Sequence, residues 1–229
     1  MLSLLGKVTD DISRAVLEFP AMDGVERLHA EILACTRCRD AGFIEVAAPV
    51  VAGHAGNRIM LIGQAPGVTE LEVRRPFQGR AGRELFRWMA SIGIGEAEFR
   101  DTVYMTAITK CFPGRARSGS GDRRPSSREI DMCRPWLERQ LDLIRPRVLL
   151  LVGTLAIERY FGATSLAQLV GRRFTRDGMT LVPLPHPSGA SRWLNDEAHR
   201  ELLRVALQLV REEWDRLSRR QLPEAVASG

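Results

Sequence analysis

The chain has 229 residues, of which 45% are hydrophobic and 27% are charged. This balance is typical of a globular protein and excludes a disordered, collagen-like or coiled-coil chain. Prolines and charges interrupt every apolar stretch before it reaches the roughly 20 residues of a membrane-spanning helix. The net charge of +5 favours polyanions such as nucleic acids as partners, although the predominance of Arg over Lys is also what a GC-rich genome produces.

Residues 1–5 are apolar, but no basic region precedes them, and Asp10 and Asp11 follow soon after. The N-terminus therefore does not resemble a signal peptide. We expect a cytoplasmic protein with no membrane partner. In a reducing compartment, four cysteines indicate metal ligands before disulfides.

Short apolar runs alternate with amphipathic segments along the chain. Strands are expected at 58–62, 102–106, 147–152 and 179–184, and helices at 8–34 (broken by Pro20), 82–91, 128–143, 155–160 and 196–217. The Gly-, Pro- and Arg-rich segment 112–125 is expected to be a loop. This alternation predicts an α/β fold, a three-layer α/β/α sandwich around a four-stranded, mainly parallel sheet. Residues 1–220 would form one domain and 221–229 a frayed tail.

The loops that follow the predicted strands are the first place to look for a binding site, because ligands of parallel sheets bind outside the carboxyl ends of the strands. These loops lie at 63–67, 107–111, 153–154 and 185–188. Most of them are rich in turn-forming and polar residues. Each one alone is explained by an ordinary tight turn, but together they indicate a site.

Four cysteines form the second signal. Cys35 and Cys38 form a C-x-x-C pair, and Cys111 and Cys133 follow a strand and lie on a helix. Four thiolates without a nearby histidine fit an all-cysteine zinc site or a [4Fe–4S] cluster, and spacing alone does not separate the two. Inert burial is an alternative for Cys133, but it does not explain a C-x-x-C pair among charged residues.

Six short motifs occur in a fixed order: GQAPG at 63–67, RPFQGRAG at 75–82, VYMTA at 103–107, KC at 110–111, CRPWL at 133–137 and HPSG at 186–189. Interleaved with the cysteines, they resemble the uracil-DNA glycosylase superfamily, specifically its iron–sulfur branches, families 4 and 5. The resemblance runs from about Ala34 to Leu194. It implies a monomeric, monofunctional enzyme that hydrolyses the N-glycosidic bond of uracil in single- or double-stranded DNA and so starts base-excision repair. It also implies a structural [4Fe–4S] cluster, rather than zinc, on Cys35, Cys38, Cys111 and Cys133.

Such an enzyme flips the target nucleotide into a pocket. The resemblance assigns base stacking to Phe77, a hydrogen bond to the departing uracil to His186, water holding to Glu70 and an orienting role to Gln64. The residues expected to contact the substrate beside Phe77 are Gly63, Ala65, Pro66, Gly67 and Ala107. Each assignment has a structural alternative: Phe77 in the core, Glu70 paired with Arg74, or His186 as a turn anchor.

Two positions depart from the family patterns. Family 4 usually has Glu where this chain has Gln64, and the aspartate that follows such a glutamine in family 1 is Ala65 here. Ala107 stands where family 4 reads uracil with an asparagine, as in family 5, and losing a bidentate amide removes roughly 1–3 kcal/mol of discrimination. Two other functions therefore stay open, a broader glycosylase acting on hypoxanthine and a non-catalytic protein that binds lesions or single strands.

The loop at 112–128 carries five arginines and one acidic residue, and we expect it to meet DNA phosphates, a solvated insertion being the alternative. It contains no histidine, which excludes the covalent DNA trapping of a related branch. Small residues after the fourth strand allow close approach to phosphate, with Arg192 or Trp193 filling the gap left by the flipped base. The residues expected to contact DNA are Arg115, Arg117, Arg123, Arg124, Ser188, Gly189, Ser191 and Arg192.

Overall fold

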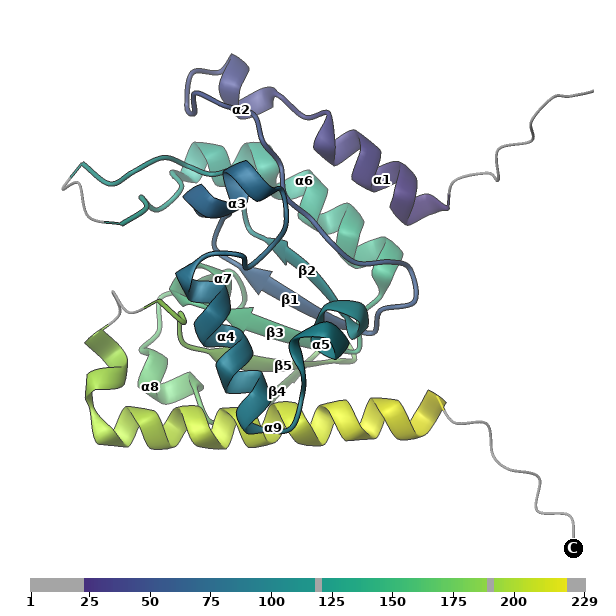
Figure 1. Ribbon diagram of the computed structural model, residues 1–229, viewed down its shortest axis with the longest axis vertical. Coiled ribbons are helices and arrows are strands. Elements are labelled where there is room, and N and C mark those ends of the chain that lie inside the picture. Colours follow the sequence, from purple (N-terminus) through teal and green to yellow (C-terminus); the bar gives the residue numbers. More distant parts are fainter. Residues whose placement is uncertain (1–22, 118–120, 189–191, 222–229) are drawn as a thin grey trace, which may run out of the picture.

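The computed structural model describes residues 23–117, 121–188 and 192–221 (Figure 1). Parts of three sequence predictions therefore lie outside the described residues. They are the start of the first predicted helix, the two DNA-contact candidates Gly189 and Ser191, and most of the C-terminal tail.

A five-stranded sheet in the order β2-β1-β3-β5-β4 forms the centre of the molecule. The strands β1 (Ile59–Gly63), β2 (Val103–Ala107), β3 (Val148–Val152) and β5 (Met179–Leu184) are parallel. The fifth, β4 (Phe174–Arg176), pairs antiparallel with β5 at the edge. The predicted four-stranded count was wrong by this strand, because three residues with two exposed polar side chains lack the apolar run that marks a buried strand.

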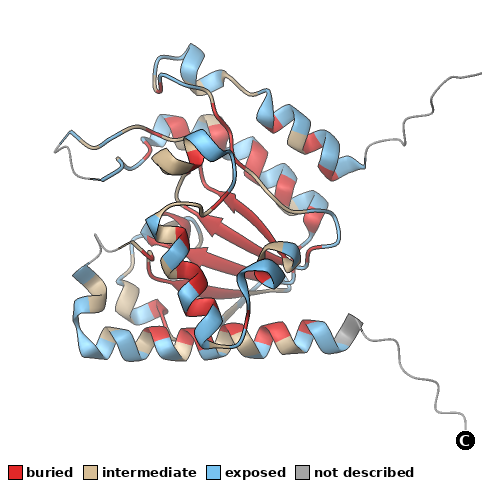
Figure 2. Ribbon diagram, viewed as in Figure 1, coloured by how far each residue is buried: buried red, intermediate tan, exposed pale blue. Residues whose placement is uncertain are grey.

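Helices cover both faces of the sheet, as the sequence predicts (Figure 1). Successive strand residues point to opposite faces, so Ile59 and Leu61 pack on one side and Met60 and Ile62 on the other. The first side is covered by α4 (Arg80–Ser91), α5 (Glu96–Thr102) and α9 (Glu197–Gln221). The second is covered by α1 (Gly24–Leu33), α6 (Ser127–Ile144), α7 (Thr154–Phe161) and α8 (Leu166–Leu169). Figure 2 shows the four parallel strands buried along their length.

Capping side chains fix where two of the long helices begin. Asp23 and Glu26 form a reciprocal capping box at α1, and Ser126 and Glu129 form another at α6. Ser126 is thus the cap that the sequence left open between two serines. The short elements α2 (Arg37–Asp40), α3 (Val68–Val73) and the 3-10 turn η1 (Arg192–Asn195) were not predicted.

The parallel strands all end on the same side of the sheet, which brings the loops after β1, β2, β3 and β5 together. None of the described helices is both long and apolar enough to cross a membrane. The fold therefore presents one edge at which side chains from distant parts of the sequence meet.

Candidate active site and cysteine centre

A cavity of about 500 Å³ lies at the carboxyl ends of the strands. We call it the base cavity. Every residue predicted to catalyse or to contact the base lines it, together with Ser188: Gly63, Gln64, Ala65, Pro66, Gly67, Glu70, Phe77, Ala107, His186 and Ser188. The structure thus brings together residues that the motifs place up to 125 positions apart in the chain.

Phe77 is held in the cavity wall by a strained backbone. Its φ is 54°, in the left-handed region that side chains disfavour. Gly82 makes the conformation possible, since a Cβ there would lie 2.0 Å from the Phe77 carbonyl oxygen. From α5, Arg100 donates hydrogen bonds to the carbonyl oxygens of Pro76 and Phe77 at 2.9 and 3.0 Å. Phe77 also touches the core, but strain of this kind is typical of a functional position rather than of simple core packing.

Glu70 is buried and its carboxylate is bound by three main-chain N–H groups. Oε1 accepts from Gln78 and Gly79 at 2.7 and 2.9 Å, and Oε2 accepts from Gly67 at 3.0 Å. These bonds tie the loop that carries Phe77 to the turn after β1. No ion pair joins Glu70 to Arg74 in the described part of the chain, so the predicted alternative for this residue is not what the structure has. Glu70 is a positioning residue for the cavity.

His186 follows β5 and presents its imidazole to the base cavity. Its Nδ1 accepts a hydrogen bond from the Ser188 N–H at 3.2 Å, so the neutral ring carries its proton on Nε2. Burial lowers the pKa of His186, which keeps the ring neutral at neutral pH. Room for the ring depends on Gly153, whose φ is 87° and where a Cβ would lie 3.1 Å from His186 Cδ2. The histidine therefore anchors a turn through one nitrogen and keeps a donor on the other.

The loop after β2 closes the cavity with main chain rather than with a side-chain amide. The Ile108 and Thr109 N–H groups donate to the carbonyl oxygens of Gly63 and Gln64 at 2.9 and 3.2 Å. Ala107 is buried beside them and offers no side-chain donor or acceptor. Lys110 lies outside the base cavity, and its buried ammonium donates to the Ala107 carbonyl oxygen. Burial lowers the pKa of Lys110 to about 8.

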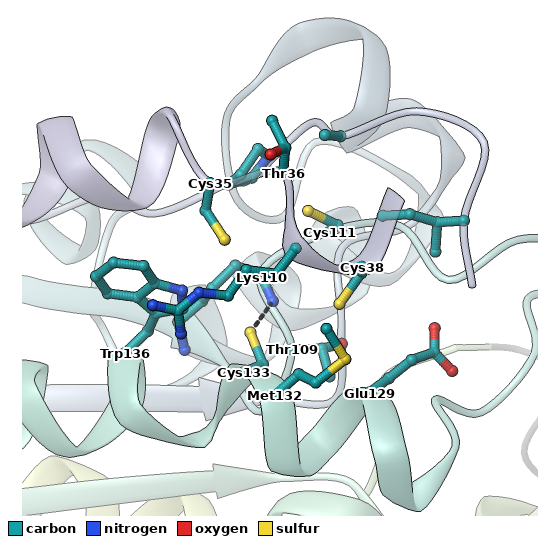
Figure 3. A pocket seen from close by; sticks show the side chains of 14 residues that line it. Cys35, Thr36, Cys38, Thr109, Lys110, Cys111, Glu129, Met132, Cys133 and Trp136 are labelled. Atoms are coloured by element: carbon teal, nitrogen blue, oxygen red, sulfur yellow. Dashed lines mark hydrogen bonds between the residues drawn. The ribbon is translucent and has the colours of Figure 1, made fainter. Parts of the chain in front are cut away.

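The four cysteines line a second cavity, which we call the cysteine cavity (Figure 3). Cys35 and Cys38 come from the α1–α2 segment, Cys111 from the loop after β2, and Cys133 from α6. Burial raises the pKa of Cys38 to about 11 and that of Cys111 to about 12. Thiols in this environment ionise only when a strong positive charge, such as a metal, compensates.

The spacing of the thiols bears on which metal group they fit. Among the described residues, no three His, Cys, Asp or Glu side chains are close enough together to hold a single metal ion. A tetrahedral zinc site brings four sulfurs to about 2.3 Å from one ion. The wider arrangement around a shared cavity suits a cluster, in which each thiolate binds a different iron.

Two unsatisfied polar groups also face the cysteine cavity. Trp136 Nε1 and Thr109 Oγ1 are buried without a hydrogen-bond partner, and both residues line this cavity. An orphaned buried donor costs about 1–3 kcal/mol. Inorganic sulfide and thiolate sulfurs would accept both hydrogens, and hydrogen bonds to sulfur are usual around iron–sulfur clusters. The donor set therefore fits a [4Fe–4S] cluster.

Comparison with known proteins decides the family. A family model described as the uracil DNA glycosylase superfamily matches residues 51–209. The chain belongs to this superfamily. It is 30% identical over 178 residues to the type-4 uracil-DNA glycosylase of Sulfurisphaera tokodaii, covering 74% of this chain and 76% of that protein. It is also 32% identical over 145 residues to the type-4 uracil-DNA glycosylase of Archaeoglobus fulgidus, covering 63% and 67%. Its similarity extends to the type-5 uracil-DNA glycosylase of Pyrobaculum aerophilum, with 29% identity over 150 residues.

The superfamily match confirms the resemblance drawn from the ordered motifs. It contains the whole base cavity, together with Cys111 and Cys133, and begins after Cys35 and Cys38. Similarity to both type-4 and type-5 relatives agrees with the mixed motifs of the first and second loops.

The arginine-rich loop of this superfamily member is more ordered than a simple loop. Arg115 and Asp122 form a β-bridge that folds the segment into a short hairpin. Arg123 turns back into the protein, donating to both oxygens of buried Glu129 at 2.7 and 2.8 Å and to the Phe43 carbonyl oxygen at 2.9 Å. Arg124 pairs with Glu158. Arg115 and Arg117 are exposed, as is Arg192 on η1.

The candidates for filling the space of a flipped base are also distinguished by their surroundings. Trp193 stacks on His199 with ring centroids 4.1 Å apart and packs against the core. Arg192 is exposed beside it. Of the two residues that the sequence left open, Arg192 is the one whose side chain is accessible to DNA.

Sequence reasoning missed three residues that the glycosylase fold brings to the site. Asp122 enters the base cavity, Arg100 fixes the loop of Phe77, and Lys110 bridges the two cavities. Only Asp122 carried a signal, as the single acidic residue of a basic loop. The other two depend on contacts between segments that no local pattern reveals.

Proposed function

We propose that this protein hydrolyses the N-glycosidic bond of uracil in DNA and thereby starts base-excision repair. The observation that carries the proposal is the base cavity, in which a neutral His186 donor and the strained Phe77 ring lie on opposite elements of one pocket. The type-4 names of the relatives support the same activity.

The residues of the cavity suit the demands of the reaction. A flipped uracil would stack on Phe77, which is sandwiched into place by the Gly82 and Arg100 contacts. When the glycosidic bond breaks, uracil leaves as an anion, and the Nε2–H of neutral His186 would donate to its carbonyl oxygen. A preorganised donor of this kind is typically worth about 10²–10³ in rate. Gln64 would orient the base or the attacking water from the turn after β1.

We propose a monofunctional glycosylase, one that uses water rather than an amine. A lyase reaction would need an amine nucleophile at the sugar. The chain has two lysines, Lys7 and Lys110. Lys7 lies outside the described residues, and Lys110 lines the cysteine cavity instead of the base cavity.

We propose that Cys35, Cys38, Cys111 and Cys133 hold a [4Fe–4S] cluster. The cluster would act as a structural cross-link between the α1–α2 segment, the loop after β2 and α6. The fit of the spaced thiols and of the two orphaned donors supports this assignment over zinc. Glycosidic hydrolysis needs no electron transfer, so the bond-breaking chemistry belongs to the base cavity.

The proposed partner is uracil-containing DNA, single- or double-stranded, bound by a monomer in the cytoplasm. One chain supplies both the base cavity and the exposed arginines beside it, so a second subunit is not required. Arg115, Arg117 and Arg192 are the exposed candidates for phosphate contacts. Arg123 and Arg124 would reach DNA only by giving up carboxylate partners.

A broader substrate range is the second candidate function, and Ala107 favours it. Without a side-chain amide at this position, the cavity selects a base by its shape and its main-chain groups. Hypoxanthine presents similar edges, so release from inosine-containing DNA is a direct comparison.

The test is incubation of the purified protein with labelled single- and double-stranded oligonucleotides that contain uracil, inosine or neither, followed by alkali. Strand cleavage at uracil only after alkali would support a monofunctional uracil glycosylase. Equal cleavage at inosine would support the broader enzyme. Binding without cleavage would contradict both and leave a non-catalytic lesion-binding protein.

A further inference from the structure

A second carboxylate, that of Asp122, enters the base cavity beside Glu70. Its Oδ2 lies 3.1 Å from the point at which a side chain on Gly67 would begin, and Glu70 Oε2 lies 2.8 Å from the same point. The two acidic groups therefore meet at the turn after β1, next to Ala65, where the chain lacks an acid of its own.

The hairpin holds Asp122 in this position. The Ala116 N–H donates to the Gly121 carbonyl oxygen at 3.1 Å, and the Arg123 N–H donates to the Gly114 carbonyl oxygen at 3.0 Å. The next side chain, Arg123, is fixed by the bidentate contact with Glu129. Asp122 thus sits between two paired main-chain positions and a buried ion pair, which restrains where its carboxylate points.

The two carboxylates differ in how much of each is free. Glu70 uses both oxygens to accept three main-chain N–H groups. Asp122 accepts from Arg115 Nη1 on Oδ1 at a long 3.4 Å, and no hydrogen bond to its Oδ2 is found within the described residues. Its side chain is 33% exposed, so water reaches it from the cavity mouth. Of the two, Asp122 is the carboxylate with an oxygen available to a water molecule.

We propose that Asp122 is the general base of the reaction, holding the attacking water through Oδ2 and accepting its proton. The proposal rests on uracil excision as the proposed function. The C1′–N1 bond breaks and its electron pair leaves with the uracil anion. The water oxygen forms the new bond to C1′, one of its protons passes to Asp122, and the other remains in the hydroxyl group of the abasic sugar. Asp122 then returns its proton to solvent or to the uracil anion.

The electrostatic surroundings suit this role. Burial raises the pKa of Asp122, Arg115 lowers it, and the neighbouring Glu70 raises it, with a net upward shift. Arg80 and His186 are the other titratable or charged groups that line the same cavity. A carboxyl group whose pKa is raised from about 3.9 is a stronger base and is still ionised near neutral pH.

The test compares single-turnover excision of uracil by the wild-type protein and by Asp122→Asn over pH 4 to 8. General base catalysis typically contributes about 10²–10⁴-fold, so we expect a loss of at least about 10²-fold at neutral pH. The wild-type rate should fall as the pH drops through the raised pKa of Asp122, because the base must be ionised. That acid limb should be missing in Asp122→Asn and return in Asp122→Glu.

Two controls separate a base from a structural contact. Asp131→Asn removes an exposed carboxylate of α6 that pairs with Arg134, and it should keep the wild-type rate and acid limb. Arg115→Gln removes the ion-pair partner of Asp122 but leaves its carboxylate, so it should weaken DNA binding yet keep the acid limb. If Arg115→Gln instead reproduces the rate loss and the flat profile of Asp122→Asn, Asp122 acts by holding the hairpin and the proposal is wrong.

The remaining outcomes are also decisive. An Asp122→Asn rate within about fivefold of wild type, or one that keeps the acid limb, contradicts the proposal while leaving uracil excision intact. A wild-type protein that releases no uracil contradicts the proposed function, and the role of Asp122 fails with it. Thermal unfolding of each variant is measured in parallel, and Asp122→Glu decides the question if Asp122→Asn proves unstable.

Discussion

Replacing Glu70 by Gln separates a structural role of this carboxylate from the water-holding role that the family resemblance implies. The Glu70 oxygens accept N–H groups from Gly67, Gln78 and Gly79 at 2.7 to 3.0 Å. Glutamine has one acceptor oxygen and one NH₂ group. If its oxygen keeps the bonds to Gln78 and Gly79, its NH₂ faces the Gly67 N–H, and donor meets donor.

The size of the effect follows from these contacts. A hydrogen bond to a charged group contributes about 1.5–3 kcal/mol, and a buried donor left unpaired costs about 1–3 kcal/mol. One such bond is lost and two others lose the charge of their acceptor, so we expect Glu70→Gln to reduce the free energy of unfolding by about 2–3 kcal/mol. In a domain of this size each kcal/mol lowers Tm by about 2–4 °C. The expected decrease in Tm is therefore about 4–12 °C.

Thermal and urea unfolding followed by circular dichroism measure this change. Glu72→Gln is the matched control, because Glu72 is an exposed glutamate on the same helix, α3 (Val68–Val73), and its substitution should leave Tm within about 1 °C. A Glu70→Gln protein that melts like wild type but loses about 10²-fold in single-turnover rate would refute the clamp and restore the water-holding role.

Three further outcomes are expected. His186→Ala should lower the single-turnover rate about 10²-fold or more with little change in DNA affinity, as measured by fluorescence anisotropy, because the lost donor acts mainly on the departing base. Arg115→Ala with Arg117→Ala should flatten the salt dependence of binding by up to about 0.9 units of slope per duplex phosphate contact, whereas Arg123→Ala should instead lower the free energy of unfolding by about 3 kcal/mol by stranding buried Glu129. Cys133→Ala should lose bound iron and sulfide, whereas Trp136→Phe should keep both and shift the reduction potential to a more negative value.

The sequence was sufficient to predict the parallel sheet and most of the base cavity. Each parallel strand is a run of buried apolar residues that ends in turn-forming residues, and this pattern is local. The motifs identified Phe77 and His186 because their spacing within RPFQG and HPSG does not depend on the rest of the fold. Short elements such as β4 and α3 have too few residues for a hydrophobic period to show, so they were missed.

The roles of charged residues were harder to predict, because they depend on partners far away in the sequence. Four arginines in one loop suggested a uniform phosphate-binding surface. The structure divides them, with Arg123 bound to buried Glu129 and Arg115 and Arg117 exposed. Glu70 was expected to face water or Arg74, yet its partners are N–H groups that converge only after the chain folds back on itself.

The division of the arginine loop also connects the two cavities. Glu129 lines the cysteine cavity and holds Arg123, and the residue before Arg123 is Asp122 in the base cavity. A second connection runs through Lys110, whose N–H donates to Cys133 Sγ at 3.3 Å and whose ammonium donates to the Ala107 carbonyl oxygen. Both connections are buried and short, so a displacement at the cysteines has little room to dissipate before it reaches the base cavity. This geometry explains how a metal group with no part in breaking the glycosidic bond would still be required for a well-formed base cavity.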